Sequence, residues 1–180
     1  MSRKLTRTAV VEAATAAIDE DGLDRLSMRA VAARLDVEAM SLYRHVANKG
    51  AMLDAVYDGL LGQLEVPSGL AWDEAVSKVA CAFRDLMFAH PRCVPLLASR
   101  AGTTPAALKL VTDGVQLLED SGFSEDDAIV AFQTVFTFCV GHAIFHTAGG
   151  QPVTDDEWAR FEFAEGLAAI LAGLSARSQG

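Results

Sequence analysis

The chain contains 180 residues, of which 51% are hydrophobic and 22% are charged, and its formal net charge is −9. This length fits one domain or two small domains that share a core, and the apolar content excludes a disordered chain. The cysteines Cys81, Cys93 and Cys139 are odd in number and widely spaced, so neither a disulfide framework nor a zinc ribbon is expected. We therefore expect a cytoplasmic protein, and the basic N-terminus lacks the apolar segment of a signal peptide.

In chain order, the first fifty residues predict three helices. Apolar residues at helical spacing indicate a helix over residues 6–20, with Thr6 as its N-cap and Gly22 just past its end. Ser27 begins a second helix that ends near residue 35, and residues 36–38 form a turn. A short third helix then runs to about His45.

A connecting helix over about residues 48–64 follows, capped by Asn48, and residues 67–69 interrupt the chain. Further helices are predicted at residues 72–90, 105–120, 124–147 and 154–174, with Ser124 and Thr154 as N-caps and a short helical turn near residues 91–95. With no convincing strand, the fold class is all-α with about nine helices.

The segment between Asp127 and Asp155 contains no charged residue and is long enough to span a bilayer. However, it contains several threonines and two histidines, and no cluster of lysine or arginine flanks it. A helix buried by protein on most of its sides is the better interpretation, so no membrane span is expected.

The net charge is unevenly distributed along the chain. Residues 1–50 carry a net charge of +1, whereas residues 51–180 carry −10. The acidic bulk argues against broad adhesion to nucleic acid, but it leaves room for a small basic surface near the N-terminus.

Residues 27–49 carry the most informative pattern. Two short helices are joined by a three-residue turn, and Val31, Leu42 and Val46 are spaced to share a small core, which is the helix-turn-helix geometry. The second helix would present an outward face that fits the major groove of DNA. Hydroxyl, imidazole and ammonium groups around it could donate to phosphates.

This region resembles the tetracycline-repressor-like (TetR) family of transcriptional regulators over about residues 5–60. The resemblance rests on Leu26-Ser27-Met28-Arg29, Leu35-Asp36-Val37, Leu42-Tyr43-Arg44-His45-Val46 and Asn48-Lys49. It implies a homodimer that binds a near-palindromic double-stranded DNA operator and is released by a small-molecule effector. By position, it implies a base contact from Arg29, recognition-helix contacts from Ala39, Met40 and Tyr43, and phosphate contacts from Ser27, Ser41, His45 and Lys49. Arg44 is a further candidate for DNA contact, because its spacing places it on the same outward face as Met40 and Tyr43.

The chain departs from the family pattern at four places, one of which is Gly50, which follows the usual lysine and weakens the start of the connecting helix. Asp36 replaces a common turn glycine, although aspartate tolerates a left-handed backbone. Ala47 stands where a basic residue is frequent. Residues 62–65 lack the histidine of the antibiotic-binding members, so binding of tetracycline with magnesium is not carried over.

The C-terminal half contains an aromatic stripe that predicts a core or an apolar ligand pocket. Such a pocket needs an apolar lining with a few polar groups, and it would take an apolar or amphipathic effector. The candidate ligand-binding residues are Phe83, Met87, Phe132, Phe136, Cys139, His142, Phe145 and His146.

His142 and His146 stand one helical turn apart, which leaves three interpretations open: a metal pair, a buried or interface pair, or polar contacts to a ligand. No third metal ligand is evident nearby in the sequence, so no metal or other cofactor is expected. Small residues on the last two long helices favour a homodimer interface of four helices, two from each subunit.

No nucleophile motif, P-loop or dinucleotide-binding motif is present, so an enzyme is not expected. The chain is therefore interpreted as a helix-turn-helix DNA-binding domain at residues 1–50, a connecting helix, and a ligand-binding and dimerisation domain at residues 67–180. The expected function is a ligand-responsive repressor. The alternative is a helical ligand-binding or metal-binding protein that does not bind an operator.

Overall fold

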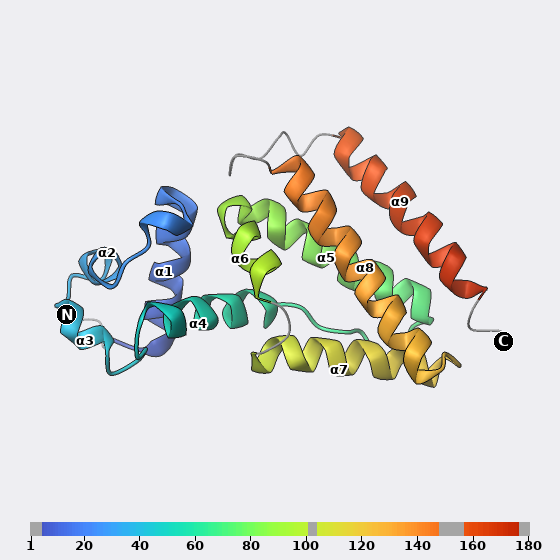
Figure 1. Ribbon diagram of the computed structural model, residues 1–180, viewed down its shortest axis with the longest axis horizontal. Coiled ribbons are helices and arrows are strands. Elements are labelled where there is room, and N and C mark those ends of the chain that lie inside the picture. The colour runs from blue at the N-terminus through green and yellow to red at the C-terminus, as the bar shows by residue number, and fades with distance from the viewer. Residues whose placement is uncertain (1–4, 101–103, 148–156, 177–180) are drawn as a thin grey trace.

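The computed structural model describes residues 5–100, 104–147 and 157–176. These residues form nine α-helices and two short 3₁₀ helices and contain no strand, which confirms the predicted all-α class (Figure 1). The α-helices are α1 (Arg7–Asp21), α2 (Met28–Arg34), α3 (Ala39–Leu42), α4 (Lys49–Leu61), α5 (Trp72–Ala89), α6 (Val94–Ser99), α7 (Pro105–Asp120), α8 (Glu125–His146) and α9 (Glu157–Ser175). The 3₁₀ helices are η1 (Leu23–Arg25) and η2 (Pro91–Cys93).

The predicted N-caps form as expected wherever the structure describes them. The side chains of Thr6, Ser27, Asn48 and Ser124 each accept a hydrogen bond from the backbone N–H three residues later. Each bond satisfies one donor of the first turn that has no partner within the helix. The predicted cap Thr154 lies outside the described residues.

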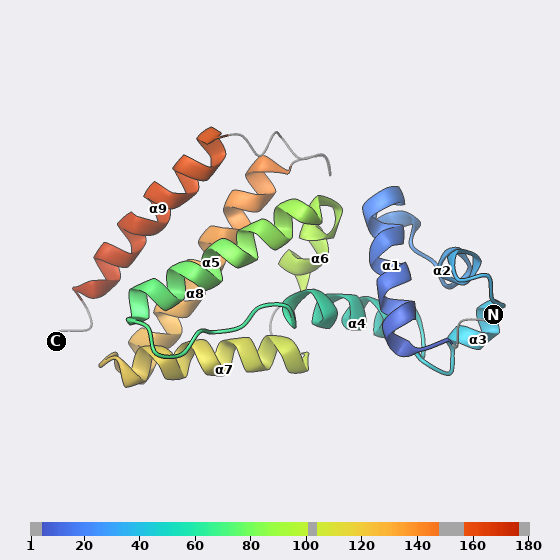
Figure 2. The same cartoon turned by 180° about the vertical axis from the view of Figure 1, so that it is seen from behind.

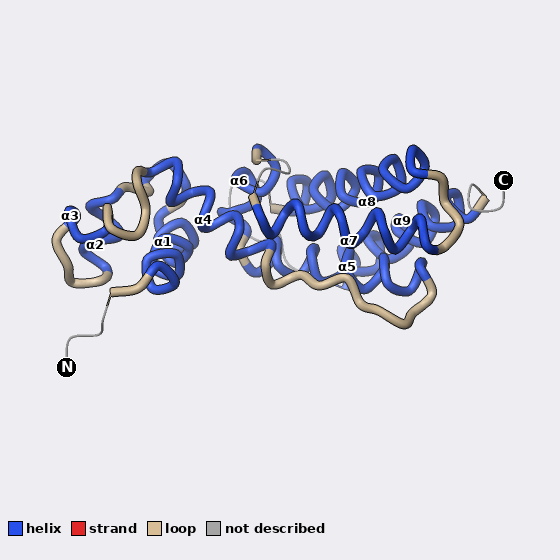
Figure 3. Tube along the Cα trace, turned by 90° about the horizontal axis from the view of Figure 1, so that it is seen from below, coloured by secondary structure: helices blue, strands red, loops and turns tan. Residues whose placement is uncertain are grey.

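Helices α1, α2 and α3 pack around a small apolar core at one end of the molecule, and Figures 1 and 3 show α3 at the far end from α9. Val31 and Leu42 are fully buried, and Leu35 and Val37 pack against them from the turn. Asp36 has a φ of 53°, so the aspartate does adopt the left-handed conformation that the turn requires. Helix α3 is shorter than predicted, since regular helix ends at Leu42 and residues 43–45 form a turn.

Helix α4 leads from these helices into a larger bundle, where it packs against α6 and α7 (Figures 1 and 2). The backbone N–H of Ala106, in the first turn of α7, donates to Asp58 Oδ1 of α4 at 2.7 Å. A second connection joins α1 to η2, where His90 Nδ1 lies 2.8 Å from Asp19 Oδ2 and Arg92 donates to the backbone of Glu20. The N-terminal helices are therefore held to the bundle at two separate places.

Helix α8 is the central helix of this bundle. By length and composition it could cross a membrane, but it packs against α5, α6, α7 and α9. Ala128, Ala131 and Ala143 are fully or almost fully buried along it, so the neighbouring helices approach closely. This packing explains the long uncharged segment as the core helix of a bundle.

Candidate functional site

The exposed surface of α2 and α3 carries most of the residues that the sequence assigns to DNA. Met40 is 72% exposed and Tyr43 is 48% exposed, although both are large side chains that a folded core would normally bury. Arg29, Arg44 and Lys49 are also exposed, whereas Ala39, Ser41 and His45 are half-buried. Met40, the ring of Tyr43 and three cations thus lie on or beside α2, α3 and the start of α4. Figure 1 shows α2 and α3 at one end of the molecule.

Ser27 has two possible uses. Its Oγ accepts from the backbone N–H of Ala30 at 3.2 Å, which caps α2. A hydroxyl that accepts one hydrogen bond still has its own proton to donate, so Ser27 keeps a donor for a phosphate oxygen.

Two acids at the end of α1, Glu20 and Asp21, are paired with Arg34, whereas Asp36 and Glu38 in the turn between α2 and α3 are exposed. Arg34 donates to Glu20 at 2.9 and 2.5 Å and to Asp21 at 3.3 Å, and this pairing lowers the pKa of Glu20. Asp19 contacts His90. The carboxylates at the end of α1 are therefore partly neutralised, which reduces their repulsion of a polyanion.

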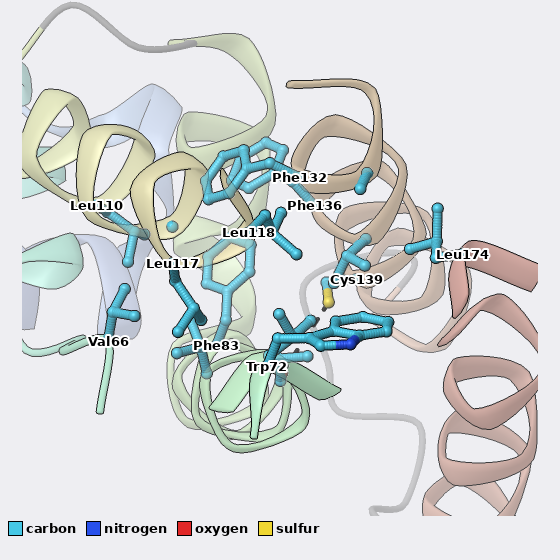
Figure 4. A pocket seen from close by; sticks show the side chains of 16 residues that line it. Val66, Trp72, Phe83, Leu110, Leu117, Leu118, Phe132, Phe136, Cys139 and Leu174 are labelled. Carbon is cyan, nitrogen blue, oxygen red and sulfur yellow. Dashed lines mark hydrogen bonds between the residues drawn. The ribbon is translucent and has the colours of Figure 1, made fainter. Parts of the chain in front are cut away.

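An apolar cavity lies between α5, α7 and α8 (Figure 4). Phe83 of α5 stacks on Phe136 of α8 with ring centroids 5.2 Å apart, and Phe132 stacks on the other side of Phe136. Cys139 also lines the cavity, and burial raises the pKa of its thiol to about 12, so the thiol stays neutral. The lining residues are Val66, Trp72, Val76, Val79, Ala80, Phe83, Leu110, Gly114, Leu117, Leu118, Ala131, Phe132, Val135, Phe136, Cys139 and Leu174.

The cavity has a volume of about 50 Å³. Pockets that hold drug-sized ligands span about 300–1,000 Å³, so the cavity is too small for such a ligand in this structure. On the other side of Phe132 and Phe136, a surface groove of about 380 Å³ runs between α4, α7 and α8, and it includes Tyr57, Leu61 and Gln133. The two phenylalanine rings line both spaces and therefore form a wall between the small apolar cavity and the groove.

The sequence-predicted ligand residues fall into two groups. Phe83, Phe132, Phe136 and Cys139 line the cavity. Met87, His142, Phe145 and His146 do not lie among the lining residues. Met87 is fully buried elsewhere in the core, Phe145 is 75% exposed on α8, and the two histidines contact each other and α9.

The α7 wall of the cavity is absent from the sequence prediction. Leu110, Gly114, Leu117 and Leu118 recur at helical spacing, so the apolar face of α7 was visible in the sequence. Nothing in the sequence indicated that this face meets Phe132 and Phe136. Glu162 of α9 was also missed, although it lies 2.9 Å from His146 Nε2.

Comparison with known proteins identifies both halves of the chain. Residues 10–56 match the family of bacterial regulatory proteins named tetR, and residues 67–160 match the tetracyclin repressor-like C-terminal domain. The class A tetracycline repressor of Escherichia coli, from transposon 1721, is 34% identical over 152 residues, which cover 81% of this chain and 69% of that protein.

Two solved structures are similar over nearly the whole chain. ActR of Streptomyces coelicolor in complex with actinorhodin has a TM-score of 0.83 and 27% identity, covering 99% of this chain and 100% of ActR. BioQ with its double-stranded DNA operator has a TM-score of 0.78 and 29% identity, covering 96% and 99%. Two other curated regulators are longer, and the chain spans 59% and 53% of their lengths. With both family models matched in the expected order, the chain belongs to the tetR family of bacterial regulatory proteins.

Proposed function

We propose that the chain is a cytoplasmic, ligand-responsive transcriptional repressor that binds a near-palindromic operator as a homodimer. The observation that carries the proposal is the exposure of Met40 and Tyr43 beside exposed cations on a helix-turn-helix. The proposal keeps the division of the chain into a DNA-binding part over residues 1–50, the connecting helix α4, and a ligand-binding and dimerisation part over residues 67–180.

The residues around α3 have distinct roles in this proposal. Met40 and Tyr43, with Ala39 beside them, contact base edges in the major groove, and Arg29 reads a base from the start of α2. Ser27, Ser41, Arg44, His45 and Lys49 contact phosphates and fix the register of the protein on the duplex. Ala47 offers no contact of this kind, which lowers the phosphate count by one per subunit.

Selection from a random duplex library, followed by a salt titration on the selected sequence, tests operator binding. We expect a near-palindromic sequence and a steep fall of affinity with salt, because bound phosphates release counterions. Lys49→Ala should weaken binding to all sequences and reduce the salt slope by about one for each phosphate that is no longer neutralised. Tyr43→Ala and Arg29→Ala should also change the preferred sequence.

The matched control is Lys78→Ala, which removes the same charge from an exposed ion pair on α5. It should leave both affinity and salt slope unchanged. No enrichment at any salt concentration would contradict operator binding and would favour the alternative, a ligand-binding protein without an operator.

The homodimer forms through α8 and α9 in this proposal. Ile144 and Phe145 of α8 and Trp158 and Phe161 of α9 are between 49% and 75% exposed, which is unusual for residues of this size in a monomer. Covering them with the same helices of a second subunit gives a four-helix interface. Light scattering should show a dimer that Phe161→Arg converts to a monomer, whereas a wild-type monomer would contradict this interface.

The effector enters between α5, α7 and α8 by displacing Phe132 and Phe136, so that the small cavity joins the groove. The cavity accepts an apolar body, and the groove provides the amide of Gln133 and the hydroxyl of Thr137 for a polar end. An amphipathic effector fits this combination better than a wholly apolar one. Because the groove also includes Tyr57 and Leu61, its occupant would press on α4 and shift the population away from the DNA-binding form.

Actinorhodin, the ligand in the ActR complex, is the first effector to test. We expect it to release the operator and to change the fluorescence of Trp72, which lines the cavity. Gln133→Leu removes the exposed amide that the groove offers to the polar end of the effector, and it should weaken release without affecting operator binding. Release that persists undiminished in this variant would place the effector elsewhere.

A further inference from the structure

Two histidines of α8 and one glutamate of α9 form a cluster outside both the helix-turn-helix surface and the apolar cavity. One ligand atom from each of His142, His146 and Glu162 lies within 4.8 Å of the others. The two imidazole rings are 4.4 Å apart, and His146 Nε2 is 2.9 Å from Glu162 Oε2. The pairing follows from the antiparallel arrangement of α8 and α9, which places the end of α8 beside the start of α9 (Figure 1).

His142 is the unexplained member of this cluster. It is only 9% exposed, and among the described residues neither of its ring nitrogens has a hydrogen-bond partner of acceptable geometry. The ring also interacts with the backbone of Ala159. A buried polar group left unpaired costs about 1–3 kcal/mol, so native proteins rarely keep one without a ligand, water or ion.

We propose that His142, His146 and Glu162 bind a divalent transition-metal ion of the zinc type, with water as the fourth ligand. Two imidazoles and one carboxylate match the preference of Zn²⁺ and disfavour Mg²⁺ or Ca²⁺, which require oxygen ligands. Zinc bonds of about 2.0–2.1 Å in a tetrahedron place the ligand atoms about 3.3 Å apart. Because all three ligand atoms already lie within 4.8 Å of one another, the contraction needed is at most about 1.5 Å.

Of the charged groups around the cluster, one opposes a bound cation and one favours it. The buried guanidinium of Arg84 opposes a second cation, but Arg84 lies 2.8 Å from Asp85 and packs over the ring of Phe88. Glu162 contributes a negative charge directly to the site.

The site would join α8 to α9, the two helices of the proposed dimer interface. Phe145 contacts His146 edge to face, and Phe161 precedes Glu162 on α9. A bound ion would therefore fix the relative position of the helices that carry the exposed aromatic residues. Metal binding itself needs no operator and no effector, so its test is independent of the proposed function.

The test is calorimetric titration of the purified, chelator-treated full-length protein with zinc chloride, together with a Co²⁺ absorption spectrum. We expect one ion per chain with a micromolar or tighter dissociation constant, a raised melting temperature, and a Co²⁺ spectrum without thiolate bands. Glu162→Gln keeps the size of an exposed side chain and should weaken zinc binding by about tenfold or more. Glu165→Gln, one turn further along the exposed surface of α9, is the matched control and should bind like wild type.

His142→Phe provides the second variant, because His142 already packs among the rings of Phe88, Phe138 and Phe163. It should abolish zinc binding while leaving the metal-free protein folded by circular dichroism. The proposal is overturned if wild type binds no zinc, or if Glu162→Gln binds it as tightly as wild type. The operator selection can fail while zinc binding succeeds, and zinc binding can fail while the operator selection succeeds. The two experiments therefore test the two proposals independently.

Discussion

The substitution Gly114→Ala tests how tightly the wall of the cavity is packed. A Cβ atom on Gly114 would lie 2.7 Å from both Cδ2 and Cε2 of Phe132. Carbon atoms pack at about 3.5–4.0 Å, so the ring must retreat by about 1 Å towards Phe136. Gly114 lies in the interior of α7, where alanine is favoured over glycine by about 0.8–1.0 kcal/mol.

The clash with Phe132 and the higher helix propensity of alanine oppose each other, so their magnitudes decide whether Gly114→Ala raises or lowers the free energy of unfolding. Overpacking of this kind costs about 1–3 kcal/mol, so Gly114→Ala should destabilise the protein by about 0–2 kcal/mol. Gly141→Ala makes the same chemical change in α8, where the new Cβ would meet nothing within 4 Å. It should stabilise the protein by up to about 1 kcal/mol, which makes it the matched control.

Guanidinium unfolding followed by circular dichroism, at one protein concentration, measures both free energies of unfolding. The variant Phe132→Leu removes the ring, so in that background Gly114→Ala should regain its helix-propensity advantage, with a coupling of about 1–3 kcal/mol. If Gly114→Ala stabilises the wild-type protein as much as Gly141→Ala does, the ring moves aside without cost. The wall between cavity and groove would then be loosely packed, contrary to this reasoning.

The remaining predictions concern a helix start, the thiols and an ion pair. Asp58→Ala leaves a backbone N–H in the first turn of α7 without its acceptor and should lower the free energy of unfolding by about 1–2 kcal/mol in the same assay; an unchanged value would show that water replaces the carboxylate. Burial raises the pKa of Cys93 and Cys139 to about 12, so a thiol reagent at pH 8 should label the exposed Cys81 alone until the protein is unfolded, and labelling of the two buried thiols should speed up as the pH rises. Rapid labelling of two thiols in the folded protein would refute this. Arg34→Ala should lower the free energy of unfolding by less than about 1 kcal/mol, because its partners Glu20 and Asp21 are exposed. A larger decrease would show that these ion pairs also order the turn between α1 and α2.

The sequence predicted what depends on neighbouring residues. Thr6, Ser27 and Asn48 cap their helices as expected because a capping hydrogen bond joins residues only three apart. The left-handed Asp36 followed from the same local reasoning. Contacts between distant residues, such as that of Arg34 with Glu20, depend on how helices are arranged, and a single sequence does not specify that arrangement.

The lining of the candidate cavity could not be predicted in full from the sequence for the same reason. Helix α8 is apolar around most of its circumference, so the sequence pattern does not show which face of the helix points into the core. Residues on several faces were therefore assigned to one pocket. Phe132 and Phe136 lie on the side that meets α7, whereas His142 and His146 lie on the side that meets α9. A helix with a clear polar face would have permitted the distinction from the sequence.

The small size of the cavity gives the proposed repressor a physical basis for its response. A ligand shifts an equilibrium only by binding one state better than the other, and a cavity of about 50 Å³ excludes an effector from the present state. In the proposed response, opening the cavity would move Phe132 and Phe136 into the groove that Tyr57 and Leu61 of α4 help to line. Helix α1 is meanwhile held at its far end by the contact between Asp19 and His90. A push on α4 with α1 anchored at η2 would rotate the N-terminal helices rather than translate them, and rotation changes the separation of two recognition helices in a dimer.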